Sequence, residues 1–348
     1  MSNDAAVGQH EIIGIKQDID YTGGEYSKWF STSKLGLFIH WGISTVHGDV
    51  DLSWGMMANK PWEIKQGYDK AITPREYFSL AERFKPDSFS IDKTLNLAKK
   101  AGFTYAVFTT KHHDGFALWP SNYGSFNTKK YQEGRDFVQE YVQACRKSGL
   151  RVGLYYSPPD WYFNREYMSF NYGGRDPKIN LPLTDFDIDH KPTVLKQRSR
   201  EFMDAYKEYT KNQIIELMTN YGKIDMLWFD GDAGISDCIE QEEIRALQPD
   251  ILLNPRLHGK GDFQTFECKM PDKKPEGLWE HEDIWAEGPW WAYMETVKNK
   301  YRPVSEILEV YNKIKEWNGN FLINIGLKAD GSLPQTAEQR IEELGENL

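Results

Sequence analysis

The stretch Asp225-Met-Leu-Trp-Phe-Asp230-Gly231 constrains the fold of this chain more than any other. The apolar run Met226 to Phe229 predicts a short strand that is buried on both faces, as strands are in a parallel sheet covered by helices. Asp230 then stands at the carboxyl end of that strand, which is where α/β barrels carry their catalytic groups. The alternative is a turn-forming Asp-Gly pair, which is common at strand ends.

Similar apolar runs alternate with helical patterns along the first two thirds of the chain. Strands are predicted at 34–42, 105–110, 150–157 and 226–229, and helices at 73–83, 91–101, 136–148 and 195–221. This alternation indicates a parallel α/β structure, and we expect a TIM-like (β/α) barrel. No Gly-x-Gly-x-x-Gly follows any strand, which argues against a nicotinamide or flavin site.

The second half of the barrel is expected to be less regular. Short strands are predicted at 251–254, 261–267, 278–282 and 321–326, with helices at 240–247, 304–317 and 336–344. Two segments, 46–72 and 160–193, lack a sustained period and are predicted to be long loops over the barrel mouth.

Composition narrows the classes of partner. The chain of 348 residues fits one barrel domain, and its net charge of -10 with a pI near 5.4 argues against a nucleic-acid surface. No stretch approaches the roughly 20 apolar residues that span a bilayer, so no membrane partner is expected. The three cysteines are widely spaced, which predicts free thiols. The amino terminus has no secretory signal, so we expect a cytoplasmic protein, or a periplasmic or secreted one if a signal peptide had been removed.

Polar residues at the ends of the predicted strands should meet in one mouth. They are His40, His112, His113, Tyr155, Asp230, Arg256 and Glu267. Two carboxylates among many aromatic rings are what glycoside hydrolysis needs, because one attacks the anomeric carbon while the other protonates the leaving oxygen. A lone buried histidine is more often structural. The His112-His113 pair could also bind a metal ion, but no third histidine or cysteine lies near it in the sequence, so we expect neither metal nor cofactor.

These motifs resemble those of the α-L-fucosidases of glycoside hydrolase family 29. The resemblance rests on Lys34 to Gly42, Lys111-His-His-Asp-Gly-Phe116, Leu154-Tyr-Tyr-Ser157, Trp228-Phe-Asp-Gly231 and Phe321 to Gly326 followed by Lys328-Ala-Asp-Gly331, in this order from about residue 24 to 345. It implies a retaining mechanism with Asp230 as the nucleophile. It also implies a pocket for the terminal sugar lined by His40, Trp54, His112, His113, Tyr155 and Arg256, with Trp228 packed beneath the sugar.

The resemblance leaves the acid/base less certain than the nucleophile. Glu267, at the end of Gly261-Asp-Phe-Gln-Thr-Phe-Glu267, matches a form in which such a segment leads to the glutamate, and it is our first choice. Glu280 and Glu282 are its rivals, although charges around His281 are also consistent with a solvated cluster.

Three departures from the family pattern bear on substrate and domain structure. Ser53-Trp54 stands where Glu-Trp is usual, and Asn254-Pro255-Arg256 stands where Asn-Asp-Arg is usual. Both changes affect predicted sugar contacts, so the expected substrate is a fucosylated glycan or, as the alternative, an L-galactosylated one. We expect an N-terminal extension at 1–23 and a catalytic domain at 24–348, without the C-terminal β-sandwich of the family. The rivals from other classes are a non-catalytic sugar-binding barrel and a metal-dependent hydrolase.

Overall fold

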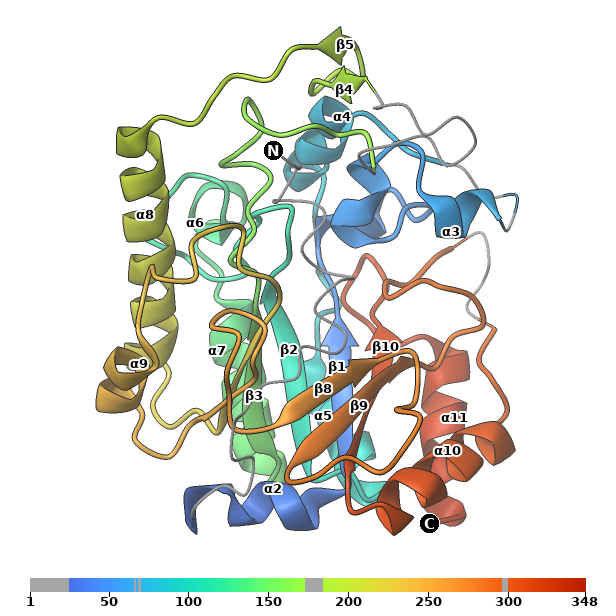
Figure 1. The fold of residues 1–348 in the computed structure, drawn as a ribbon. Helices are drawn as coiled ribbons and strands as arrows, with labels where there is room; N and C mark the ends of the chain where they lie inside the picture. Colours follow the sequence, from blue (N-terminus) through green and yellow to red (C-terminus); the bar gives the residue numbers. More distant parts are fainter. Residues whose placement is uncertain (1–24, 66, 68–69, 173–183, 296–299) are drawn as a thin grey trace.

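The computed structural model describes residues 25–65, 67, 70–172, 184–295 and 300–348. The expected extension at 1–23 lies outside the described residues, as do residues 173–183 of the loop predicted at 160–193. Within the described part, the chain forms an eight-stranded parallel sheet that curls into a barrel surrounded by helices (Figure 1).

The barrel strands follow chain order around the sheet, from β7 through β6, β3, β2, β1, β10 and β9 to β8. Their bounds are β1 (Leu35–His40), β2 (Tyr105–Lys111), β3 (Arg151–Tyr156), β6 (Met226–Phe229), β7 (Leu252–Leu253), β8 (Gln264–Glu267), β9 (Trp279–Ile284) and β10 (Asn320–Gly326). All seven ladders are parallel. The predicted α/β barrel is therefore confirmed.

The barrel has an open edge between β7 and β8, where the described residues form no ladder. A single backbone hydrogen bond joins the two sides, from the amide of Asp262 to the carbonyl of Leu253 at 2.8 Å. The carboxylate of Asp262 reinforces this joint, because it also accepts the amide of Leu253 (2.7 Å), the guanidinium of Arg245 (2.8 Å) and the hydroxyl of Tyr26 (2.8 Å). One aspartate thus replaces the ladder that two longer strands would have formed.

In the part of the chain that the structure describes, six helices cover the barrel: α5 (Ile91–Lys100), α7 (Phe137–Ser148), α8 (Arg200–Thr219), α9 (Gln241–Leu247), α10 (Val304–Glu316) and α11 (Gln335–Glu346). Side-chain caps begin three of them, α7, α8 and α9. Asp136 caps α7 by accepting the amide of Gln139, and Gly149 ends it at a φ of 70°. The predicted start of α8 at Leu195 is wrong, because the hydroxyl of Ser199 accepts the amide of Phe202 and caps the helix there.

The second half is irregular as predicted, since residues 254–278, all of them described, contain no helix. Figure 1 accordingly shows β8 and β9 without a covering helix at the front, with α8 and α9 along one side and α10 and α11 along the other.

Short elements close the two ends of the barrel. The loop predicted at 46–72 contains the 3-10 helix η3 (Leu52–Met56) and helix α3 (Pro61–Ile64), and with α4 (Pro74–Ser79) and the hairpin β4 (Asp185–Phe186) and β5 (Pro192–Thr193) it lies over the mouth at the top of Figure 1. Further short segments are η1 (Glu25–Ser27), η2 (Ile43–Val46), η4 (Leu80–Glu82) and α6 (Thr128–Tyr131). Helix α2 (Lys28–Ser33) lies at the opposite end, where the ring of Phe30 packs into the barrel interior against Phe263.

Alternation along the strands separates two cores. Phe38, Tyr105, Val107, Tyr155, Met226, Trp228 and Leu322 fill the barrel interior, and a larger apolar cluster packs between the strands and the helices. Gly36 also lies on the inward face, where a Cβ would collide with the ring of Tyr105. On β6 the inward positions are Met226 and Trp228, so the next inward position is Asp230.

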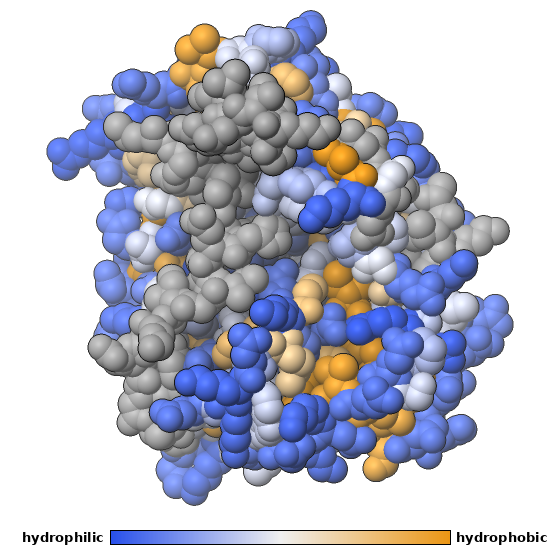
Figure 2. Space-filling view, turned by 45° about the vertical axis from the view of Figure 1, so that its right-hand side comes forward, coloured by the Kyte–Doolittle hydropathy of each residue, from blue (hydrophilic) through white to orange (hydrophobic). Residues whose placement is uncertain are grey.

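The face in Figure 2 is mostly hydrophilic, with apolar patches between polar side chains. Among the described residues, every helix is too short or too polar to cross a bilayer.

Candidate active site

Asp230 lies directly after β6, at the mouth end of the barrel, and its side chain is 12% exposed. The hydroxyl of Tyr155 donates to its Oδ2 at 2.6 Å, and Nη1 of Arg256 donates to its Oδ1 at 3.1 Å. These two hydrogen bonds fix the orientation of the carboxylate. The carboxylate is therefore held at the cavity wall by donors from β3 and from the residues after β7.

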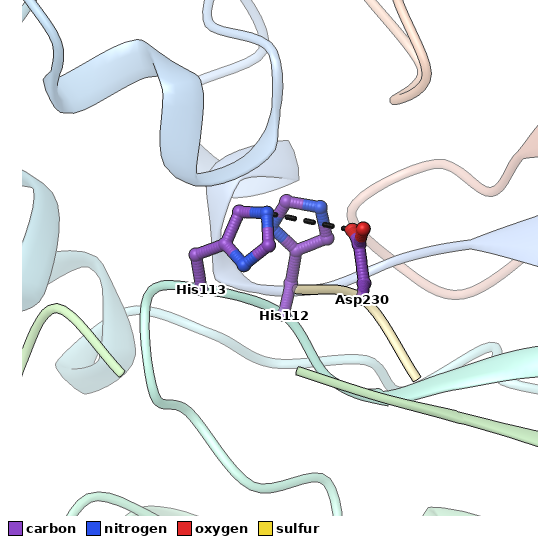
Figure 3. A group of neighbouring side chains, drawn as sticks. All are labelled: His112, His113 and Asp230. Atoms are coloured by element: carbon purple, nitrogen blue, oxygen red, sulfur yellow. Dashed lines mark ion pairs between the residues drawn. The ribbon is translucent and has the colours of Figure 1, made fainter. Parts of the chain in front are cut away.

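Figure 3 shows the rings of His112 and His113, which follow β2, beside the carboxylate of Asp230. Nε2 of His113 lies 3.4 Å from Oδ2 of Asp230. The hydroxyl of Ser157 donates to the carbonyl of Pro159 at 2.7 Å, so it accepts the hydrogen of His113 Nδ1 at 2.5 Å. In this tautomer Nε2 of His113 carries a lone pair, and it faces Oδ2 of Asp230, which is also an acceptor. This arrangement suits a hydroxyl hydrogen supplied from the cavity.

The three histidines of the site are buried and neutral. Burial lowers the pKa of His40 to about 4 and that of His113 to about 3, and it lowers the pKa of His112 well below its usual range. Nδ1 of His40 pairs with the amide oxygen of Asn324 at 2.7 Å, and Nδ1 of His112 pairs with the hydroxyl of Ser53. These fixed neutral rings can accept or donate hydrogen bonds without carrying charge.

Arg256 lies between three carboxyl groups. Besides Asp230, its Nη2 donates to Oε2 of Glu267 at 2.8 Å and to Oε1 of Glu282 at 2.5 Å. Burial alone would lower the pKa of Arg256, but the three neighbouring carboxylates outweigh burial and raise it. The guanidinium carbon also lies 4.5 Å from the ring centre of Trp228, which supports it from below.

The three candidate acid/base glutamates occupy different depths. Glu280 and Glu282 share the inward face of β9 because they are two residues apart. Glu280 is fully buried beneath the cavity, where its carboxyl oxygens accept hydrogen bonds from Oη of Tyr105 (2.5 Å) and from Nε1 of Trp228 (3.1 Å). Glu282 lines the cavity with a side chain that is 0% exposed, and Glu267 lines it with one that is 18% exposed. Glu267 is thus the most accessible of the three.

The cavity has a volume of about 530 Å³. Most of the residues predicted to bind substrate or to react line this cavity: His40, Trp54, His112, Tyr155, Trp228, Asp230, Arg256 and Glu267. His113 is not part of this lining, but its Nε2 lies beside the carboxylate of Asp230, which is part of it. Ser53 lies behind His112 instead of in the cavity wall, and Pro255 is buried outside that wall.

The sequence reasoning missed several cavity residues. They are Asp51, Trp62 and Trp291, together with Asn324, the partner of His40. Asp51 accepts the amides of Trp291 (2.9 Å) and Ala292 (2.7 Å), and burial raises its pKa to about 7. Asn324 was open to prediction, since it is a polar residue within the last apolar strand. Asp51 and Trp291 lie in loops and Trp62 in the short helix α3, and the aperiodic sequence around them gives no such signal.

His112, His113 and Asp230 also offer three ligand atoms within 4.8 Å of one another, which is a grouping that could hold a cation. Both oxygens of Asp230 already accept hydrogen bonds, and one of the two donors is the positively charged Arg256. A dication would have to compete with that charge. The arrangement is better suited to a neutral polyhydroxylated ligand, whose hydroxyl groups can bind to the carboxylates, the neutral histidines and Arg256.

Comparisons with known proteins identify the family to which the chain belongs. The family model described as alpha-L-fucosidase matches residues 16–348. The chain is 26% identical to mouse tissue alpha-L-fucosidase over 345 residues, which cover 92% of this chain and 69% of the mouse protein. It matches 91% of its length to a relative from Caenorhabditis elegans at 26% identity and spans 64% of that relative, so it covers about two thirds of these proteins.

Solved structures are similar over most of the chain. Alpha-L-fucosidase isoenzyme 1 from Paenibacillus thiaminolyticus aligns with a TM-score of 0.73 at 28% identity, over 92% of this chain and 75% of that one. The fucosidase AlfC, in a variant form, aligns with a TM-score of 0.74 at 29% identity, over 93% of this chain and 98% of its own. On the family match over residues 16–348, the chain belongs to the α-L-fucosidase family of glycoside hydrolases, family 29.

Proposed function

We propose that this protein is a retaining exo-glycosidase that removes terminal α-L-fucose from oligo- or polysaccharides. The observation that carries the proposal is the shared contact of Arg256 with Asp230 (3.1 Å) and Glu267 (2.8 Å) at one cavity. A single guanidinium can contact two carboxyl groups only when they lie close together. Retaining enzymes need a separation of about 5–5.5 Å, which leaves no room for a water between nucleophile and sugar.

In the proposed mechanism, Asp230 attacks the anomeric carbon while Glu267 gives its proton to the departing glycosidic oxygen. Water then attacks the glycosyl-enzyme ester and returns a proton to Glu267. Tyr155 and Arg256 orient Asp230 before the attack, because they donate to its two oxygens. The neutral histidines 40, 112 and 113 bind sugar hydroxyls, Trp54 contacts the sugar from the cavity wall, and Trp228 packs beneath it.

Accessibility favours Glu267 over its rivals as the acid/base. The proton must reach an oxygen of the substrate, and Glu280 has both carboxyl oxygens bonded beneath the cavity. Glu282 lines the cavity but is fully buried. Glu267 is partly exposed in the same wall, which allows it to contact both the glycosidic oxygen and the attacking water.

The proposed substrate is a fucosylated glycan, and this agrees with the ligands named for relatives. AlfC from Lactobacillus casei was solved with α-L-fucose as product, and a variant of AlfC with Fucα(1,6)GlcNAc. L-galactose remains the second candidate because the side chain of Ser53, where the family has Glu, bonds to His112 and not to the cavity. The sugar contact of that glutamate is then lost or replaced, and such a change would alter the sugar that the pocket accepts.

The deciding experiment compares initial rates on aryl α-L-fucoside and aryl α-L-galactoside, with Asp230→Ala as the blank. We expect fast release from the fucoside and none by the variant, whose fold should persist. A preference for the galactoside would move the substrate to L-galactose. Sugar binding without turnover by the wild type would make the protein a binding module, and wild-type rates in Asp230→Ala would refute the nucleophile.

A further inference from the structure

Glu282 is a carboxyl group of the cavity wall that the proposed mechanism does not use. It lies on the inward face of β9, its side chain is 0% exposed, and its Oε1 accepts Nη2 of Arg256 at 2.5 Å. Its other oxygen, Oε2, is buried and has no hydrogen-bond partner among the described residues. A buried carboxylate oxygen without a donor is costly, whereas a protonated one is less so.

The same nitrogen of Arg256 contacts Glu267. Nη2 donates one hydrogen to Oε2 of Glu267 at 2.8 Å and the other to Oε1 of Glu282, so these two carboxyl groups face each other across one amino group. Asp230 takes Nη1. One positive charge therefore serves three acids within a buried site. Simultaneous ionisation of all three would leave two uncompensated negative charges there.

Among the described residues, Arg256 is the only arginine or lysine that forms an ion pair with Asp230, Glu267 or Glu282. The titratable and charged groups that face Glu282 come from several strands and loops, and they are Arg256, Glu267, Glu280, His281, Tyr105 and Cys268. Burial is the largest cause that raises the pKa of Glu282, and the charges of Glu267 and Glu280 add to it, while Arg256 and His281 oppose it. The net result is a pKa of about 8. The geometry and the charge count agree that a proton stays in this group near neutral pH.

We propose that Glu282 is a positioning residue that forms a coupled pair with Glu267 on Arg256, and that this pair retains one proton while Asp230 is ionised. The inference rests on the proposed function, because it explains how the general acid is supplied with its proton. Two carboxyl groups that interact this strongly titrate as a pair, so the proton belongs to both. The state in which Glu267 holds the proton and Glu282 the charge is the reactive one.

The proton count closes over one turnover. In the first step the pair loses its proton to the glycosidic oxygen as the bond from Asp230 to the anomeric carbon forms and the glycosidic bond breaks. In the second step the attacking water gives one proton back to the pair while its oxygen displaces Asp230. Glu282 touches no reacting atom in either step, and its part is to keep the proton available at Glu267.

The test is the pH profile of kcat/KM on an alkyl α-L-fucoside, whose poor leaving group needs protonation. Glu282→Gln keeps an acceptor for Arg256 but cannot ionise, so Arg256 then stabilises a charge on Glu267 alone. We expect the alkaline limb to move to lower pH by about one unit or more, the size that a charge at this range produces. Glu280→Gln changes a buried carboxyl on the same face of β9 that makes no hydrogen bond to Arg256 and interacts with Glu282 less strongly than Glu267 does, so it should move the limb less than Glu282→Gln does.

A uniform loss of kcat/KM at every pH in Glu282→Gln, with the limb unmoved, would overturn the inference and give Glu282 a structural role. Should that variant not fold, ¹³C-carboxyl NMR of the wild type decides, since two glutamate signals must titrate together and a Glu267 signal with a single independent step refutes the pair. Glu267→Gln tests the proposed function separately. If it fails to affect the alkyl fucoside more than an aryl fucoside with a good leaving group, the acid is misassigned whatever Glu282 does.

Discussion

Replacing Glu280 by glutamine should protect the fold against a rise in pH. Glu280 is fully buried in the barrel, where its oxygens accept the hydroxyl of Tyr105 at 2.5 Å and Nε1 of Trp228 at 3.1 Å. Burial raises the pKa of this carboxyl from 4.5 to about 7, against the opposing effect of the two hydrogen bonds. Glutamine has nearly the same shape and no charge to bury: its oxygen can accept from Nε1 of Trp228 and its NH2 group can donate to the hydroxyl of Tyr105.

The direction of this pH effect on stability follows from the difference between the pKa of Glu280 in the folded and in the unfolded protein. The folded-state pKa lies above the unfolded one, so the stabilisation from the protonated carboxyl is fully present below pH 4.5 and is lost as the pH rises through about 7. A difference between 4.5 and about 7 corresponds to about 3 kcal/mol, at about 1.4 kcal/mol for each pH unit. The wild type should therefore lose about 3 kcal/mol more stability across this window than Glu280→Gln.

The assay is urea unfolding of both proteins at pH 4.5 and pH 8, followed by tryptophan fluorescence. Other buried acids titrate in both proteins, so the difference between the two pH dependences isolates Glu280. Parallel losses of unfolding free energy in wild type and variant would refute the reasoning, because they would mean that Glu280 ionises without cost.

Three further predictions concern activity. Glu267→Ala should slow alkyl fucosides far more than aryl fucosides with good leaving groups, which need little protonation; equal losses, with a selective loss in Glu282→Ala, would transfer the role. Ser53→Ala removes the hydroxyl that pairs with His112 and should raise KM for the fucoside by about 2- to 10-fold with a smaller change in kcat, and an unchanged KM would show that His112 needs no such support. Incubation with a chelator should leave the rate unchanged, because Arg256 and Tyr155 already occupy the oxygens of Asp230; a loss that added Zn²⁺ restores would contradict this.

Much of the fold and part of the site could be predicted because they rest on local periodicity. The short apolar run of β6 placed Trp228 and Asp230 on one face, two residues apart, and the His112-His113 pair followed from a strand that ends abruptly. The start of α8 was missed because the sequence after Thr193 carries helix-compatible residues before the capping Ser199.

The ranking of the glutamates was beyond the sequence, for a physical reason. Glu280 and Glu282 share one face of β9, so periodicity treats them alike. Only the register of β9 against its neighbours sets how deep each lies, and that register places Glu280 against Tyr105 and Glu282 against Arg256. The loop residue Asp51 escaped for another reason, since its carboxylate is fixed by amides 240 residues and more away in the sequence.

The two residues proposed to be catalytic, Asp230 and Glu267, differ in how firmly the sheet holds them, because Glu267 lies at the open edge between β7 and β8 and Asp230 does not. Asp230 directly follows β6, a strand that pairs with β3 on one side and β7 on the other, and its own amide donates to the carbonyl of Tyr156, so its position is tied to the register of the sheet. Glu267 stands at the end of the edge strand β8, which pairs with β9 on one side, and among the described residues the loop before it is tied to β7 through Asp262. Loops on either side of β8 can therefore change length at little cost to the barrel. On this plan, a related chain could change the position of the proposed proton donor while the proposed nucleophile stays in place.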